Sequence, residues 1–590
     1  MEQLEQDTFV GTVEMSWRGA YVVVDHRRLR TDVFVPDERL NHARNGQRVV
    51  VHITAWKRWK RYPEGEVVEV LGESGDNDAE MHAILAEFGL PYRYPAEAVA
   101  EAGQLEPGIE KEVVRRKDMR DVTTFTIDPA DAKDFDDALS LRCLPDGSSS
   151  TDSIDSTNST NSSDSVYEVG VHIADVTHYV RPDTLLDCEA FSRGTSVYLV
   201  DRTIPMLPER LSNGICSLRP GEDKLCFSVL FRLNGNAEVL KYDIKKTVIR
   251  SDRRFSYDEA QQRLDIGSGD YAAELQTLSR LAQTLRRRRM EKGAIDFERQ
   301  EVRFRLDDAG KPLSVYFTEA TPAHQLIEEF MLLANRTVAE HIGRVGQGGK
   351  PARTFVYRVH DVPDPDRMKD FTSFIRRFGY NLKPSVRKET AARRMNSLLE
   401  QVKGTPEQSL VETLAVRAMA KAVYSTDNIG HYGLAFPYYT HFTSPIRRYP
   451  DMMVHRLLER YLKGSASVGR DEYEERCVHC SDRERLAADA ERASVKYKQV
   501  EFMQSQQGRV FEGVISNVTE WGLYVELLEN HCEGLVPLRE LGRDEYFVFN
   551  EKEFCVEGLS SGTRYTLGDH LRVRVSKTDL QRRQLDFALA

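Results

Sequence analysis

Five aspartates fall within ten residues of one segment of the chain, between two β-type runs at residues 122–127 and 138–144. Carboxylates this close together repel one another unless a cation lies among them. Hard oxygen ligands favour Mg²⁺ or Mn²⁺ over zinc. The segment therefore predicts a divalent-metal site for phosphoryl chemistry, in which the cation activates water and stabilises the leaving oxygen. The five are Asp128, Asp131, Asp134, Asp136 and Asp137.

Two other interpretations of this acidic segment need weighing. An EF-hand calcium loop does not fit, because the third and fifth positions counted from Asp128 are Ala130 and Ala132. A solvated acidic loop stays open as the second alternative. Phe135 and Ala138 interleave with the acids, which favours a segment that packs against the rest of the protein.

A second candidate lies at residues 441–451, which read His-Phe-Thr-Ser-Pro-Ile-Arg-Arg-Tyr-Pro-Asp. The two prolines make this run a rigid, non-helical approach to the helix predicted after it. A guanidinium held there could clamp a phosphate and stabilise charge in a transition state. The alternative is a helix-entry loop in which Arg448 and Asp451 pair on the surface.

The elements around these segments form three regions. Residues 8–72 and 508–590 each contain five short β-rich runs, which is typical of small OB-type barrels. Trp17, Tyr21 and Phe34 form either a base-stacking face on the first barrel or part of its core. Two small barrels of this type around a mixed domain indicate a nucleic-acid enzyme.

The region between the barrels mixes strands with long helices. We expect β-structure at 166–180, an amphipathic helix at 323–342 and a helix at 482–503. Residues 148–165 are nearly all Ser, Thr, Asn and Asp, and we expect them to form a flexible hairpin loop without chemistry. A helix followed by a charged connector is expected at 76–120.

Composition excludes several classes of protein. The chain has 590 residues, 40% of them hydrophobic, and no apolar run long enough to span a bilayer. Its N-terminus is acidic and polar, unlike a signal peptide. Eight scattered cysteines suit a reducing cytosol, so we expect a cytoplasmic protein without a membrane partner. The net charge of −11 argues weakly against a polyanionic partner, but clustered basic residues such as 286–289 fit a basic channel inside an acidic shell.

Four segments together resemble signatures of the ribonuclease II/R family, the RNB-type exoribonucleases. They are residues 126–138, residues 171–180, residues 204–218 and residues 443–449. Residues 76–91 resemble the ribonuclease R branch of this family. The resemblance implies a multidomain α+β protein with a mixed α/β RNB catalytic domain between OB-type β-barrels. The implied domains are a cold-shock-like barrel at 1–75, a helical connector at 76–120, the RNB domain at 121–505 and an S1-like barrel at 506–590.

The resemblance also implies an activity. Members hydrolyse RNA from its 3′ end to nucleoside 5′-monophosphates, so we expect a Mg²⁺-dependent, processive 3′→5′ exoribonuclease, with Mn²⁺ as a substitute cation. The expected partner is single-stranded RNA, with structured RNA left open, and the expected state is a monomer. By position, Asp128, Asp134 and Asp137 match the residues that hold the metal, and Asp136 matches the acid most critical for cleavage. The other implied residues are Arg447 at the scissile phosphate, Tyr198 and Tyr357 as stacking aromatics, and Glu491 at the 3′-terminal nucleotide.

The chain departs from the ribonuclease R pattern at both ends. One barrel precedes residue 76 where two are usual, and a lysine-rich tail is missing, as in a shortened natural form or a trimmed chain. This difference concerns substrate capture and duplex unwinding rather than the catalytic residues. Two alternatives remain, a catalytically decayed RNA-binding protein and a metal-dependent endonuclease. All four matched aspartates are present, which favours the exoribonuclease over decay.

Overall fold

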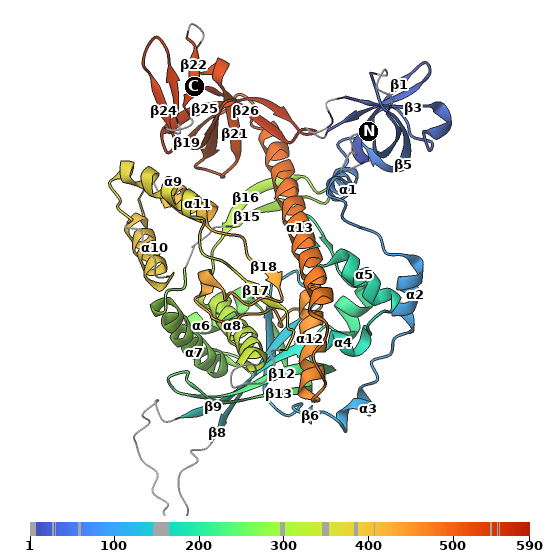
Figure 1. The fold of residues 1–590 in the computed structure, drawn as a ribbon, viewed down its shortest axis with the longest axis vertical. Helices are drawn as coiled ribbons and strands as arrows, with labels where there is room; N and C mark the ends of the chain where they lie inside the picture. Colours follow the sequence, from blue (N-terminus) through green and yellow to red (C-terminus); the bar gives the residue numbers. More distant parts are fainter. Residues whose placement is uncertain are drawn as a thin grey trace, which may run out of the picture.

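In the computed structural model, two small barrels lie side by side above a larger central block (Figure 1). A long helix, α13 (Arg470–Gln504), runs from the block to the second barrel. Residues 148–164 of the predicted Ser-rich loop lie outside the described residues. The structure describes residues 7–25, 29, 31–56, 61–144, 165–295, 301–344, 353–382, 388–405, 408–542, 545–550, 553 and 555–590.

The first barrel is closed by five strands in the order β1-β2-β3-β5-β4. Valines and other apolar residues point inward at alternate positions of these strands and form the barrel core. The third strand pairs in parallel with the fifth, with Phe34 opposite Glu64. The predicted OB-type barrel is therefore confirmed. Its strands are β1 (Thr8–Ser16), β2 (Gly19–Val24), β3 (Val33–Val35), β4 (Gln47–Ala55) and β5 (Glu64–Glu73).

The three aromatic residues considered as a stacking face lie outside this core. Trp17 is 81% exposed, and the Arg18 guanidinium lies 3.8 Å from its ring centroid. Tyr21 and Phe34 are half-buried and pack against each other, with ring centroids 5.5 Å apart. Of the three, Trp17 presents its ring most openly to a ligand.

Three helices follow the first barrel, which confirms the predicted helical character of this stretch. The first helix is fixed to the barrel by charge, because Arg48 of β4 lies 3.4 Å from Glu80 of the helix and 2.5 Å from Asp25. All three of these side chains are largely buried. The helices are α1 (Asn77–Glu87), α2 (Ala96–Gln104) and α3 (Ile109–Val113).

The central block is built on a seven-stranded mixed sheet in the order β14-β7-β8-β9-β12-β13-β6. The middle strands β9 and β12 read as nearly continuous apolar runs, because helices or loops cover both of their faces. The strands are β6 (Lys117–Asp118), β7 (Thr124–Asp128), β8 (Asp137–Leu144), β9 (Val166–Ala174), β12 (Asp223–Asn234), β13 (Val239–Arg250) and β14 (Arg253–Ser256). Short two-stranded pairs complete the block: β10 (Val197–Tyr198) with β11 (Thr203–Ile204), β15 (Glu301–Leu306) with β16 (Pro312–Thr318), and β17 (Tyr357–Val359) with β18 (Val423–Ser425).

The prediction of β-structure over 166–180 is wrong beyond Ala174. Strand β9 ends there, and one helical turn, α4 (Val176–Tyr179), follows. The reason is the buried carboxylate of Asp175, which accepts hydrogen bonds from Arg116 at 2.8 Å and Lys246 at 2.6 Å. These two cations hold the chain at the strand end and turn it away from the sheet.

Helices pack over the sheet, and α8 confirms the amphipathic helix predicted at 323–342. The basic cluster at 286–289 lies on α7 beside it. Arg286 lies 3.3 Å from Glu328, and Arg289 lies 2.5 Å from Glu329. Within the described ranges, no helix is both long and apolar enough to cross a membrane. The remaining helices are α5 (Leu185–Arg193), α6 (Tyr257–Ile266), α7 (Ala272–Glu291), α8 (Pro322–Gly343), α9 (Pro365–Ile375), α10 (Lys388–Val402), α11 (Gln408–Ala418) and α12 (Tyr449–Leu462).

The second barrel repeats the topology of the first, with the order β19-β20-β21-β26-β25, and confirms the second OB-type prediction. A three-stranded sheet, β22-β23-β24, is inserted between its third and fourth strands and was not predicted. The barrel strands are β19 (Val510–Thr519), β20 (Gly522–Leu527), β21 (Glu533–Pro537), β25 (His570–Asp579) and β26 (Gln584–Leu589). The inserted strands are β22 (Phe547–Asn550), β23 (Cys555–Gly558) and β24 (Arg564–Thr566).

Replacing Asp175 with asparagine is expected to lower the free energy of unfolding of the central block by about 3–5 kcal/mol, because two buried cations would lose their carboxylate. Urea denaturation followed by circular dichroism measures this change. Asp308→Asn, at an exposed turn, is the matched control and should stay within about 0.5 kcal/mol of the wild type. Equal stabilities for the two variants would contradict the assigned role of Asp175.

Candidate functional site

The predicted acidic segment is a β-hairpin formed by the second and third strands of the sheet, β7 and β8. Asp128 is the last residue of β7 and Asp137 is the first residue of β8, and the two strands pair with Phe125 opposite Leu139. The hairpin loop between them carries the other acids. The solvated-loop alternative is excluded for Asp136, which is 6% exposed.

A serine on a neighbouring segment fixes the shape of this loop. The Ser217 hydroxyl accepts a hydrogen bond from the Phe135 amide and donates one to the Lys133 carbonyl, both at 3.0 Å. The Leu218 amide donates to the Phe135 carbonyl at 3.0 Å. Ser217 and Leu218 follow a short π-helical turn, η2 (Arg210–Ile215). The sequence signature at 204–218 thus has a structural role, which is to hold the acidic loop.

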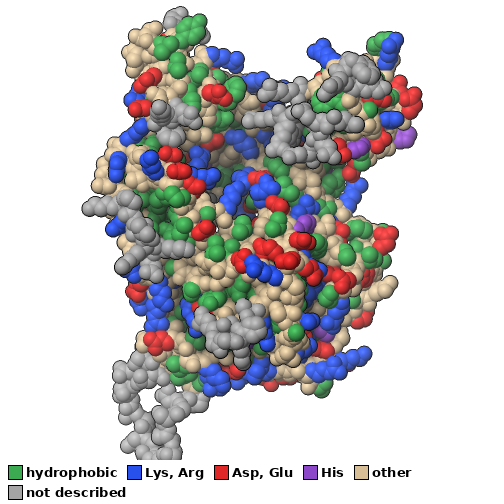
Figure 2. Space-filling view, viewed as in Figure 1, with side chains coloured by type: hydrophobic (Ala, Val, Ile, Leu, Met, Phe, Trp, Pro, Cys, Tyr) green, Lys and Arg blue, Asp and Glu red, His purple; other side chains and the backbone are tan. Residues whose placement is uncertain are grey.

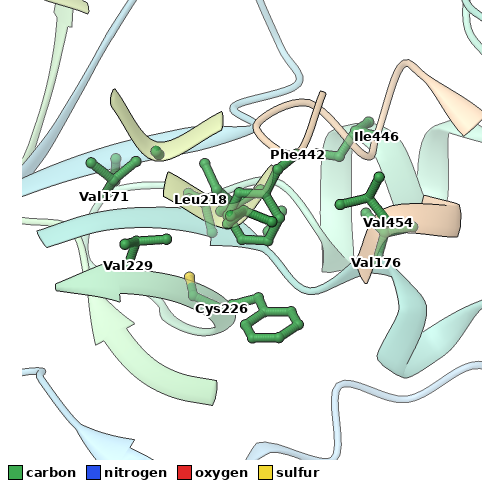
Figure 3. Packing of buried hydrophobic residues seen from close by; sticks show 14 of the residues in the cluster. Val171, Val176, Leu218, Cys226, Val229, Phe442, Ile446 and Val454 are labelled. Atoms are coloured by element: carbon green, nitrogen blue, oxygen red, sulfur yellow. The ribbon is translucent and has the colours of Figure 1, made fainter. Parts of the chain in front are cut away.

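The predicted arginine segment lies directly against the acids. The amide of Ile446 donates a hydrogen bond to Asp136 Oδ1 at 2.8 Å, and Arg447 Nε lies 3.6 Å from Asp136 Oδ2. Figure 3 shows Phe442 and Ile446 of this segment among the buried side chains that include Val454. The packing of these apolar residues fixes the position of Arg447 relative to Asp136.

The alternative of a surface pair between Arg448 and Asp451 is wrong about burial. The pair forms with two hydrogen bonds of 2.9 Å, but Asp451 is fully buried and the Arg448 side chain is only 16% exposed. Asp451 also accepts from the Ser444 amide at 2.7 Å, and the Ser444 hydroxyl accepts from Arg447 at 3.0 Å. Arg448 is therefore a structural residue, whereas the Arg447 side chain is 40% exposed.

Desolvation raises the pKa of four carboxyls in this cluster. Together with the charge of Asp137, it raises the pKa of Asp128 to about 8. It raises the pKa of Asp137 to about 6, although the charge of Arg447 lowers it. The pKa values of Asp134 and Asp136 are also raised, chiefly by desolvation. A cation among these groups would favour their charged forms.

The carboxylates fit a divalent cation by their chemistry. Asp128 Oδ2 is buried and has no hydrogen-bond partner in the part of the chain that the structure describes. Among the same residues, no three His, Cys, Asp or Glu side chains converge closely enough to hold a metal by themselves. Mg²⁺ commonly takes one or two carboxylates and completes its ligands with water and phosphate oxygens. The arrangement fits that mode better than a closed protein cage.

Of the predicted RNA-contacting residues, Tyr198 lies near this cluster, and Glu491 lies on α13. Tyr198 is on β10, and the amide of Ser196 in the same segment donates to the Arg447 carbonyl at 2.9 Å. Desolvation raises the pKa of Tyr198 to about 12, and the charges acting on its hydroxyl include that of Arg447. Glu491 is exposed on α13, one turn before Ser494, whose hydroxyl accepts from the Val200 amide at 3.3 Å.

The third predicted aromatic residue, Tyr357, has a different environment. It is 6% exposed on β17 and packs against Phe355 and Tyr438, with ring centroids 5.6 and 6.4 Å away. Its pKa is raised by burial, and the charges acting on it come from other tyrosines rather than from the aspartates. Its stacking role stays a prediction.

Tyr257 was not predicted and lies at the acidic cluster. It is the first residue of α6, directly after Ser256, which pairs with Asp128 in the parallel β14–β7 register. Its pKa is raised by desolvation and by the charges of Asp137 and Asp128. Its ring stacks on that of His324 at 3.8 Å. The sequence around Tyr257 indicates only the start of a helix. Its place beside the acids depends on the pairing of β14 with β7, which joins segments far apart in the chain.

Comparison with known proteins identifies three domains. The chain matches the family model of the RNB domain over residues 116–464. It matches the cold shock domain over residues 21–95 and the S1 RNA binding domain over residues 504–589. These matches cover the first barrel from its second strand onward, the central block up to the end of α12, and the second barrel.

Similar proteins agree with this assignment. Ribonuclease R of Thermotoga maritima is 38% identical over 596 residues, which cover 98% of this chain and 80% of the relative. The structure of Mycoplasma genitalium RNase R with ribose-methylated single-stranded RNA is 25% identical, with a TM-score of 0.89 over 99% of this chain and 90% of the other. Yeast Ssd1, a pseudonuclease, shares the fold alone, at 19% identity and a TM-score of 0.69 over 95% of this chain and 68% of the other. At the identity and coverage of the Thermotoga relative, the chain belongs to the ribonuclease R family of 3′→5′ exoribonucleases.

Proposed function

We propose that the enzyme degrades single-stranded RNA processively, taking it in by the 3′ end and releasing nucleoside 5′-monophosphates in a Mg²⁺-dependent hydrolysis. Mn²⁺ would substitute for Mg²⁺. The observation that carries this proposal is the contact between Asp136 and the Ile446–Arg447 segment. It places a buried carboxylate and a partly exposed guanidinium 3.6 Å apart.

The acids and the arginine have separate roles in this proposal. Asp128, Asp134 and Asp137 would hold or organise the cation, directly or through its water ligands, and the cation would supply an activated water and neutralise charge on the phosphate. Asp136 is fixed by the Ile446 amide and orients the attacking water beside the phosphate. Arg447 donates to the scissile phosphate, for which its exposed side chain and its contact with the Ser444 hydroxyl position it.

Aromatic and acidic side chains would position the RNA. Tyr198 stacks on a base near the 3′ end, and Glu491 accepts from the terminal nucleotide. Tyr357 would serve as the second stacking aromatic if its ring becomes accessible when RNA binds. Figure 2 shows Lys and Arg side chains in the hollow between the barrels and the central block, which suits a phosphate backbone on its way to the site.

We also propose that the enzyme acts as a monomer in the cytoplasm. One chain contains both barrels and all proposed catalytic residues, so a monomer is sufficient. All eight cysteines are free thiols, which fits the reducing cytoplasm.

A catalytically decayed RNA-binding protein is the second candidate, because a pseudonuclease shares this fold. The four aspartates argue against it, since a decayed site has no reason to keep four buried or half-buried carboxyls whose pKa values are raised. An endonuclease would use the same acids but would give fragments of intermediate length.

Asp136→Asn is expected to lower kcat by roughly 10²–10⁴-fold while RNA binding is retained. The assay incubates 5′-labelled single-stranded RNA with Mg²⁺, and an EDTA lane serves as the metal control. The wild type should give a short labelled limit product and unlabelled mononucleotides. Intact RNA in every lane despite tight binding would support the decayed protein, and mid-length fragments would support the endonuclease.

Mg²⁺ or Mn²⁺ should stabilise the folded protein by relieving repulsion among the acids. At a hundred times the dissociation constant the gain is about 2.7 kcal/mol. Differential scanning fluorimetry should show a higher Tm with cation in the wild type and a smaller shift in Asp128→Asn. Asp131 is the exposed aspartate of this segment that has no proposed role, so Asp131→Asn should keep the full shift. A full shift in both variants would place the cation elsewhere.

Ser217→Ala should release the acidic loop. The buried Phe135 amide would lose its acceptor, which lowers the free energy of unfolding by about 1–3 kcal/mol. We expect kcat to fall by roughly ten-fold or more, since small displacements of catalytic groups slow reactions strongly. Single-turnover RNA cleavage and urea denaturation measure the two effects. Ser397→Ala, exposed on α10, is the control, and an unchanged kcat for Ser217→Ala would show that the loop holds its shape without this serine.

A further inference from the structure

A cavity of about 1140 Å³ lies behind the acidic loop. Ala132, Lys133 and Phe135 of that loop form one wall, and the η2 turn with the start of β12 forms another. None of the proposed RNA-contacting residues lines it. The cavity is therefore separate from the proposed contacts to the RNA strand and yet shares a wall with the catalytic aspartates.

The charge of this cavity differs from that of the whole chain. Its lining contains five basic side chains and only two acidic ones, whereas the chain has a net charge of −11. A basic concave surface concentrates anions. The basic residues are Lys133, Arg210, Arg219, Lys224 and Arg254, and the acidic ones are Glu209 and Glu222.

Two of these cations are available to a ligand. The side chains of Lys133 and Arg219 are exposed and have no acceptor among the residues that the structure describes. The others have structural contacts: Lys224 Nζ donates to the Gly214 carbonyl at 2.8 Å, and Arg210 Nε donates to the Ala102 carbonyl at 2.9 Å. The cavity thus contains two unpaired cations among fixed ones.

Arg254 connects the cavity to the catalytic acids. Its guanidinium donates to the carbonyls of Pro129 and Ala130 in the acidic loop, and it lies 5.5 Å from the Phe135 ring centroid. Its Nε is buried without an acceptor in the described part of the chain. A ligand near Arg254 would therefore touch the segment that carries Asp134 and Asp136.

We propose that this cavity binds the released nucleoside 5′-monophosphate. The phosphate would contact Lys133 and Arg219, and the nucleoside would lie against the apolar lining of Phe135, Ile215 and Pro220. The cavity has room for a nucleoside monophosphate, because its volume of about 1140 Å³ is slightly above the range of about 300–1,000 Å³ that is typical of small-molecule pockets. The inference rests on the proposed function, because it requires that 5′-monophosphates are the products.

The test is calorimetric titration of AMP into the full chain in EDTA, where a phosphate among the catalytic acids lacks its cation. We expect AMP to bind, and the double variant Lys133→Ala/Arg219→Ala to bind it at least about ten-fold more weakly through the loss of charge-assisted hydrogen bonds. Arg287→Ala, an exposed arginine on α7, is the matched control and should bind AMP like the wild type. Adenosine should bind far more weakly than AMP.

Absence of AMP binding to the wild type, or equal binding by the double variant, would overturn the proposal. The double variant could instead bind AMP normally and bind a single-stranded oligonucleotide more weakly. That result would also overturn the proposal, because it would assign the cavity to the RNA strand. Product analysis separates this failure from failure of the proposed function. If the enzyme releases AMP but does not bind it in the cavity, only the cavity proposal is contradicted and the proposed function stands.

Discussion

The structure of the site depends on one contact, the hydrogen bond from the Ile446 amide to Asp136 Oδ1. It joins two segments 310 positions apart in the chain and brings Arg447 to the acids. Buried polar contacts with helices α8 and α12 keep the arginine segment in place. The Asn335 side chain of α8 accepts from the Phe442 amide at 2.8 Å, and His455 of α12 contacts the Phe442 carbonyl at 2.8 Å. The helices thus act as a frame for a loop that has no regular structure of its own.

This frame must also hold the four acids together against their repulsion. Burial raises the pKa of all four carboxyls, and the charge of neighbouring aspartates raises it further at Asp128 and Asp136. The strands that carry Asp128 and Asp137 are anchored in the main hydrophobic core, through Phe125 and Ile127 of β7 and Ala138 and Leu139 of β8. Carboxyls whose ionised forms are destabilised in this way are expected where a cation binds, because the cation stabilises those ionised forms.

Local patterns in the sequence predicted the elements, whereas distant pairings escaped prediction. Both barrels and the acidic hairpin were predictable, because strand alternation and turn residues act over short distances. The turn at Asp175 was missed because its cause is two cations far away in the chain. The place of Tyr257 beside Asp128 was missed for the same reason, since it depends on the parallel β14–β7 pairing. Tyr357 matched a family position, but its burial on β17 depends on packing that no local pattern records.

Arg447 and Arg448 are neighbours of one type with opposite environments, and the difference sets the charge of the site. Arg448 is paired with the buried Asp451, whereas the partly exposed guanidinium of Arg447 lies against Asp136. Without a cation, a phosphodiester entering this site would be repelled by every carboxyl that is ionised and would find few groups to neutralise its own charge. Binding of the cation and binding of the scissile phosphate must therefore favour each other. By linkage, the phosphate raises the affinity for the cation by the same factor by which the cation raises the affinity for the phosphate.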